Sequence, residues 1–173
     1  KQPENIKFKS YLHTVCDVTK FPEMLGGRVK TLHPNILGGI LACHINKQHM
    51  DEIQQYNIPR FNLVIANLYQ FQKTVHSGAS HDTIIENIDI GGPTLIRSAA
   101  KNYKSVCVLT NPYQYKEYMD ELLSIHEYCI SENIEVDYNR INDTFKYNLA
   151  RDAFKYIAEY DNNINSYFNK DIV

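Results

Sequence analysis

The sequence predicts an α/β fold with a mainly parallel sheet. Two short apolar runs, LVIANLY at residues 63–69 and VCVLT at residues 106–110, have the length and branched composition of strands buried on both faces. Helical patterns lie between and after these runs. Strands that alternate with helices are typical of an α/β sandwich, in which the strands run parallel.

The remaining elements follow from local patterns. Apolar and polar residues interleave at residues 11–18, which predicts a short strand. Residues 36–42 are small and apolar, and we expect this segment to return to the core. We expect helices at residues 49–56, 81–87 and 93–102, with Asn57 and Pro59 ending the first, Asp82 capping the second and Pro93 opening the third. A capped helix is expected at residues 112–130, and a longer one at 138–167, broken near residues 161–163.

Composition and charge exclude several classes of protein. The 173 residues are enough for one domain, and 18 Lys and Arg against 20 Asp and Glu give a formal charge of −2, which argues against a nucleic-acid partner. No long apolar run or signal peptide is visible, so we expect no membrane partner and a cytoplasmic location. The four cysteines are widely spaced without a CxxC pair, so neither a metal site nor a disulfide framework is expected.

The segment at residues 21–39, FPEMLGGRVKTLHPNILGG, is the most informative stretch of the chain. Two glycine pairs, at residues 26–27 and 38–39, allow positive φ and close approach of the backbone to a ligand. The side chains of Arg28, Lys30, Thr31 and His33 suit a phosphate and a polarised carbonyl. We expect Pro34 to stop any helix here. The alternative is a glycine-rich surface loop with solvated charges.

Two other places offer polar groups for chemistry. The first strand ends with Asn67 and Tyr69, at the carboxyl edge where open α/β sheets bind ligands. The alternative is that Tyr69 packs on the core and Asn67 starts a turn. Asp89 and a glycine pair, residues 91–92, precede a helix whose first N–H groups can bind an anion or an oxyanion. Lys101 lies at the end of that helix, where its spacing alone predicts only a favourable interaction with the helix dipole.

Several motifs together resemble one family. They are DVTKFPEMLGGRVKTLHP at residues 17–34, GGILA at 38–42, NLYQF at 67–71, ENIDIGGPTLIRSAAKN at 86–102 and LARDAFKYIAEYDNNINSYF at 149–168. These motifs closely resemble the IMP cyclohydrolase domain, the N-terminal part of the bifunctional AICAR transformylase/IMP cyclohydrolase of purine biosynthesis. The resemblance implies a methylglyoxal-synthase-like three-layer α/β sandwich with a mainly parallel sheet.

The resemblance also implies an activity and a set of site residues. The reaction is the closure of formyl-AICAR to IMP, in which the carboxamide nitrogen attacks the formyl carbon and water is lost. Positions that match the family site are Lys30, Tyr69, Asp89 and Lys101 as catalytic residues, and Arg28, Thr31, Asn67, Gly91 and Gly92 as substrate-binding residues. No metal or cofactor is implied, because 10-formyltetrahydrofolate serves only the transformylase domain. A purine ribotide substrate and a homodimer are implied, and the sequence leaves open which residue is base and which is acid.

The chain also departs from the family pattern. Gln70 replaces a proline, and residues 1–10 match neither of the two βα units that precede residue 15 in the family and carry its phosphate loops. We therefore expect a poorly matched segment at residues 1–10, a domain incomplete at its N-terminus at 11–168 and a tail at 169–173, as in a fragment or a reduced or split gene product. Three functions stay open: the cyclohydrolase, a non-catalytic purine-ribotide binding module, and an inactive fragment with a structural or interaction role.

Overall fold

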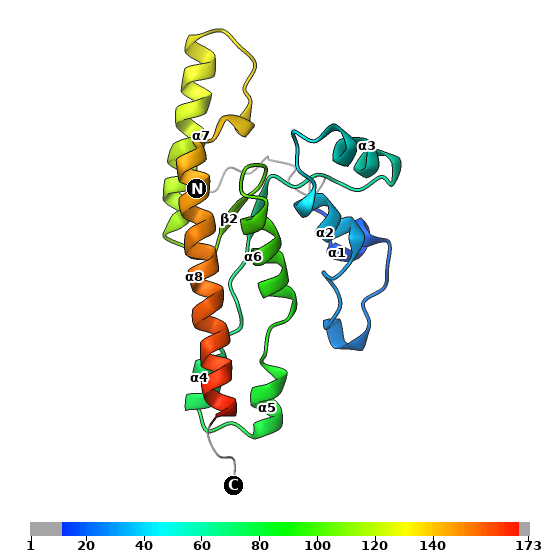
Figure 1. The fold of residues 1–173 in the computed structure, drawn as a ribbon, viewed down its shortest axis with the longest axis vertical. Helices are drawn as coiled ribbons and strands as arrows, with labels where there is room; N and C mark the ends of the chain where they lie inside the picture. Colours follow the sequence, from blue (N-terminus) through cyan, green and yellow to red (C-terminus); the bar gives the residue numbers. More distant parts are fainter. Residues whose placement is uncertain (1–11, 170–173) are drawn as a thin grey trace, which may run out of the picture.

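A computed structural model describes residues 12–169, which form a small parallel sheet packed against helices (Figure 1). In chain order the elements are α1 (Val15–Thr19), η2 (Leu25–Gly27), α2 (Pro34–Leu41), α3 (Lys47–Gln55), β1 (Leu63–Ile65), α4 (Phe71–His76), α5 (His81–Glu86), α6 (Gly91–Lys101), β2 (Cys107–Leu109), α7 (Gln114–Ser131), η3 (Tyr138–Arg140) and α8 (Asp143–Phe168). The predicted segment at residues 1–10 lies outside the described residues, as does the tail beyond residue 169. Within the described part, no helix is both long and apolar enough to cross a membrane.

The sheet is parallel, as the sequence predicts. Leu63 pairs with Cys107 and Ile65 with Leu109, and a bond of 3.0 Å from the Ala66 N–H to the Leu109 carbonyl ends the ladder. All of β2 is buried, which confirms the prediction for that strand. Burial of β1 on both faces is wrong at Ile65, whose side chain is 53% exposed, and β1 ends well before residue 69.

The core lies where α6 and α8 pack on each other and on the sheet (Figure 1). Ile96 and Ala99 of α6 and Ala153 and Ile157 of α8 are almost completely inaccessible to solvent. α8 continues through the predicted break at residues 161–163. Tyr167 explains this continuation, because its ring packs edge-on against Phe71 at 5.8 Å and gives the last turns of α8 a tertiary anchor that outweighs the low helix propensity of asparagine.

Two predictions near the start of the described chain are wrong because capping decides the local structure. The expected strand at residues 11–18 is instead the helix α1, which begins with a capping box between Thr14 and Asp17. The Asp17 N–H donates to the Thr14 hydroxyl at 3.1 Å, and the Thr14 N–H donates to the Asp17 carboxylate at 2.8 Å. Pro34 does not stop a helix but opens α2, since the first helical position needs no N–H donor.

The other helices occur close to their predicted positions. α3 begins two residues before its predicted start, α7 begins two residues after its predicted start, and α6 begins at Gly91 rather than at Pro93. The cap of α5 is Ser80 instead of Asp82, because the Ser80 hydroxyl accepts the Thr83 N–H at 3.3 Å. Local sequence therefore locates these helices well and misplaces only their ends.

The buried glycine of α2 offers a test of this packing. A Cβ on Gly39 would lie 2.0 Å from the Pro59 carbonyl oxygen, whereas a Cβ on Gly38 would meet only the side chain of Ile58, at 3.3 Å. We expect Gly39→Ala to lower the free energy of unfolding by about 2–3 kcal/mol, because the backbone near Pro59 must move. Gly38→Ala should change it by less than about 1 kcal/mol, since the gain in helix propensity compensates for mild crowding. Urea unfolding of both variants measures this, and equal stabilities would contradict the packing.

Candidate active site

A cavity of about 610 Å³ gathers most of the predicted site residues. Its walls come from four segments: the loop around η2, the residues after β1, the end of α5 and the start of α6. The lining residues are Glu23, Gly26, Gly27, Arg28, Lys30, Thr31, Tyr69, Ile85, Glu86, Ile88, Asp89, Ile90, Gly91, Gly92 and Leu95. All site residues implied by the family resemblance are among them except Asn67 and Lys101, and His33 instead caps α2.

The first glycine pair shapes one wall of the cavity. Gly26 and Gly27 have φ of 62° and 86°, which confirms the predicted positive φ at this pair. A Cβ on Gly27 would lie 2.9 Å from Glu23 Oε1, so the glycine makes room for this carboxylate. The second pair, at residues 38–39, lies inside α2 and does not line the cavity.

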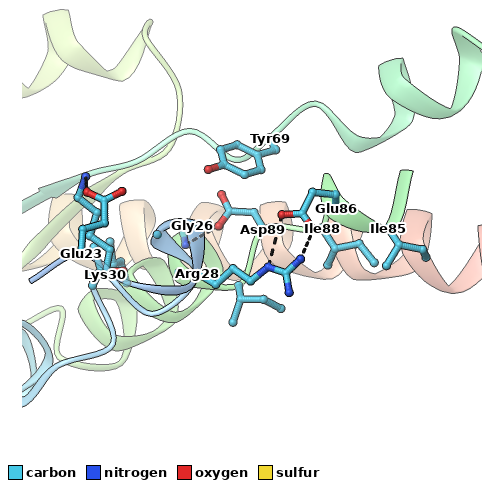
Figure 2. A pocket seen from close by; sticks show the side chains of 15 residues that line it. Glu23, Gly26, Arg28, Lys30, Tyr69, Ile85, Glu86, Ile88 and Asp89 are labelled. Carbon is cyan, nitrogen blue, oxygen red and sulfur yellow. Dashed lines mark hydrogen bonds and ion pairs between the residues drawn. The ribbon is translucent and has the colours of Figure 1, made fainter. Parts of the chain in front are cut away.

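Both cations of the cavity already pair with carboxylates (Figure 2). Arg28 forms an ion pair with Glu86, and Lys30 Nζ lies 3.0 Å from Glu23 Oε2. The hydrogen bond and the charge of Glu23 raise the pKa of Lys30, so this amine stays protonated at neutral pH. Lys30 is thus a proton donor in this geometry, and a phosphate must compete with Glu86 for Arg28.

Sequence reasoning missed Glu23 and Glu86. Each lies within a stretch that resembles the family, Glu23 at residues 17–34 and Glu86 at 86–102. The excess of basic side chains in the predicted site could have indicated them, because two cations in one cavity are usually paired with carboxylates.

Asp89 lies two residues before the first residue of α6. Its Oδ1 accepts the Gly92 N–H at 2.8 Å, so that N–H does not hold an oxyanion in this arrangement. A Cβ on Gly92 would lie 2.6 Å from Asp89 Oδ2, and a Cβ on Gly91 would lie 2.8 Å from the Thr31 hydroxyl. Both glycines are therefore needed for the carboxylate and the hydroxyl to approach the helix this closely.

Tyr69 faces Asp89 across the cavity (Figure 2). Its side chain is 60% exposed, so the alternative that it packs on the core is wrong. The cavity is therefore lined by an ammonium, a phenol and a carboxylate, from Lys30, Tyr69 and Asp89. Such a set is suited to general acid–base chemistry.

Asn67 and Lys101 lie away from this set. The Asn67 side-chain amide donates to the Thr110 carbonyl at 2.8 Å and ties together the segments that follow the two strands. Lys101 lies at the far end of α6 and lines a second cavity of about 710 Å³ with Arg97, Tyr147 and Phe154. Between residues 12 and 169, no group of three or more His, Cys, Asp and Glu side chains could hold a metal ion.

Comparisons with known proteins agree with this geometry. Residues 9–94 match the MGS-like domain family, and residues 99–172 match the AICARFT/IMPCHase bienzyme family. Among solved structures, the one described as "Crystal structure of ForH" superposes with a TM-score of 0.70 at 30% identity and covers 91% of this chain and 76% of that chain. The methylglyoxal-synthase-like fold predicted from the sequence is confirmed.

Curated relatives of the chain are bifunctional proteins. "Bifunctional purine biosynthesis protein PurH" of Prochlorococcus marinus subsp. pastoris is 45% identical over 157 residues, which are 91% of this chain and 28% of the relative. The protein of the same name from Persephonella marina is 41% identical over 156 residues, 90% of this chain and 28% of the relative. The chain therefore spans little more than a quarter of the length of these relatives.

The pairing of Lys30 with Glu23 predicts a measurable change in acidity. Glu23→Gln should lower the pKa of Lys30 towards the usual lysine value, because both the hydrogen bond and the charge of the carboxylate are lost. Lys30 would then lose its proton at a lower pH than in the unmodified protein. NMR titration of labelled lysine side chains measures this shift.

Lys116 of α7 is the control in the same titration. Asp120 raises its pKa through the same kind of contact, outside the cavity. Its titration should not change in Glu23→Gln, and an unchanged Lys30 would contradict the proposed pair.

Proposed function

Because this chain belongs to the AICARFT/IMPCHase bienzyme family, we propose that it forms an IMP cyclohydrolase domain, which closes formyl-AICAR to IMP with loss of water. The observation that carries the proposal is the gathering of Lys30, Tyr69 and Asp89 around one cavity. Relatives named for purine biosynthesis support a purine ribotide as the substrate. The proposed location of the reaction is the cytoplasm.

Ring closure needs proton movements that this cavity can assist. The carboxamide nitrogen is a weak nucleophile and must lose a proton as it attacks the formyl carbon. The formyl oxygen gains negative charge in that step and takes up two protons to leave as water, while the formamido nitrogen loses its proton as the C=N bond forms. Such a sequence of proton transfers requires neither a metal nor a redox cofactor, and we propose that none takes part.

The geometry suggests how the roles divide. Lys30 carries a proton at neutral pH and lines the cavity, so it is the group that donates a proton to the formyl oxygen. Asp89 keeps acceptor capacity beyond its bond to the Gly92 N–H and takes the proton from the carboxamide nitrogen, directly or through the Tyr69 hydroxyl. Arg28 and Thr31, at the edge of the same cavity, orient the substrate. Exchange of Glu86 for an anionic group of the substrate frees Arg28 for this task.

Catalysis tests the assignment directly. Lys30→Ala and Asp89→Asn, made in the full-length protein that contains this chain, should each slow IMP formation from formyl-AICAR by about 100-fold or more, as expected for loss of an acid or a base. Lys116→Ala, on an exposed lysine of α7, is the matched control and should keep normal turnover. Far-UV circular dichroism checks that the variants fold. Normal turnover in both site variants would contradict the proposal, and IMP binding without turnover in the unmodified protein would favour a binding module.

Lys101 requires a separate explanation. α6 rises about 15 Å from Gly91 to Lys101, which is farther than a lysine side chain reaches. We infer that Lys101 assists ring closure only from a second copy of the chain, in the homodimer that the family resemblance implies. Its position on a different cavity of its own copy supports this arrangement.

Mixing two inactive variants tests the shared site. In a dimer of Lys30→Ala with Lys101→Ala, one site would carry both substitutions and the other neither. Random pairing should therefore restore about a quarter of normal IMP formation. Each variant alone should stay slow, and mixtures with no gain over the separate variants would contradict a contribution of Lys101 across the dimer.

A further inference from the structure

Two tyrosines of α8 hold the two segments that bear Tyr69 and Asp89. The Leu68 N–H donates to Tyr156 Oη at 3.2 Å, and the Asp89 N–H donates to Tyr160 Oη at 2.8 Å. Tyr160 Oη in turn donates to the Asn87 carbonyl, at 3.4 Å. Because Tyr156 and Tyr160 are four residues apart, their side chains lie on one face of α8.

The two segments also meet each other. A Cβ placed on Gly92 would lie 2.6 Å from Leu68 Cδ2 and 2.6 Å from Asp89 Oδ2. A small displacement of either segment therefore moves the other, and it changes the distance between the Tyr69 phenol and the Asp89 carboxylate. The position of α8 therefore sets the distance between the Tyr69 phenol and the Asp89 carboxylate.

Packing restrains the segment at residues 68–69 on one side only, since Leu68 is 6% exposed and Tyr69 is 60% exposed. A hollow of about 480 Å³ lies beside it, lined by Leu68, Tyr69 and Phe71 together with Tyr156 and Tyr160. Tyr160 itself is fixed, since it is 7% exposed and its ring meets Phe71 edge-on at 6.4 Å. The Tyr156 hydroxyl thus restrains the backbone of this segment on the side of the hollow, and the Tyr160 hydroxyl restrains the backbone at Asp89.

We propose that Tyr156 and Tyr160 are positioning residues of the active site, which act through the backbone of Leu68 and Asp89 on the side chains of Tyr69 and Asp89. The inference rests on the cyclohydrolase function proposed above. Neither tyrosine lines the cavity that holds the acid–base set, so neither touches the substrate. Their hydroxyls align the groups that do.

Removal of single hydroxyls tests this in the full-length protein. Tyr160→Phe keeps the ring and should lower kcat for IMP formation by about 10- to 100-fold, because a shift of about 1 Å in a reacting group has an effect of this size. Tyr156→Phe should lower kcat in the same direction, and KM should stay within about twofold for both, since the substrate-binding side chains remain. The deficit should be the same at low and at moderate temperature, which separates misalignment from partial unfolding.

Tyr167→Phe is the matched control. Tyr167 also lies on α8 and its hydroxyl also bonds to another helix, to His81 Nδ1 at 2.8 Å, but His81 is at the start of α5 and only the end of α5 lines the cavity. Tyr160→Phe and Tyr167→Phe should lower the melting temperature by similar amounts, and only the first should lower kcat. Equal kcat in all three variants and the unmodified protein would overturn the proposal.

A second measurement does not depend on activity. In NMR spectra, Tyr160→Phe and Tyr156→Phe should shift the side-chain resonances of Tyr69 and Asp89, and Tyr167→Phe should not. Unshifted resonances would overturn the positioning role whether or not the protein makes IMP. Absence of IMP formation by the unmodified protein would instead refute the cyclohydrolase function, so the two failures are distinguishable.

Discussion

The packing of α6 against α8 and β2 is the constraint on which the rest of the structure depends. Ala99 of α6 and Ala153 of α8 are both fully buried, and such small residues allow helices to approach closely. α6 begins with the glycines of the site, two residues after Asp89, while α8 carries the tyrosines that hold the neighbouring segments. The same interface therefore stabilises the core and sets the distances between the catalytic groups.

The charge balance of the cavity follows from these positions. The described lining of the cavity holds three carboxylates, Glu23, Glu86 and Asp89, and two cations, Arg28 and Lys30. Because it has no excess of positive charge, it does not attract a free phosphate strongly. This charge balance suits the part of the substrate where the ring closes. Protons are transferred there, and that part of the substrate brings little net charge into the cavity. The paired state also keeps Lys30 protonated before the substrate arrives.

Much of the fold and site could be predicted because the informative signals are local. The apolar runs predict both strands and their parallel pairing, and Asp89 and the glycine pairs at residues 26–27 and 91–92 predict the cavity walls, whereas the pair at 38–39 lies inside α2. The predicted strand before residue 19 failed because the Thr14–Asp17 capping box outweighs the alternation of side chains. The separation of Lys101 from the site and the pairing of Glu23 and Glu86 could not be predicted, since they depend on how distant segments meet in space.

A crystal structure of the protein with bound IMP tests the central claim most directly, because it shows where the product of the proposed reaction lies. The account predicts the purine ring in the 610 Å³ cavity, with Lys30, Tyr69 and Asp89 within hydrogen-bond distance of the newly closed part of the ring. It also predicts that Arg28 has left Glu86. IMP bound instead in the cavity beside Tyr147 and Phe154, with Lys30 still on Glu23, would contradict it.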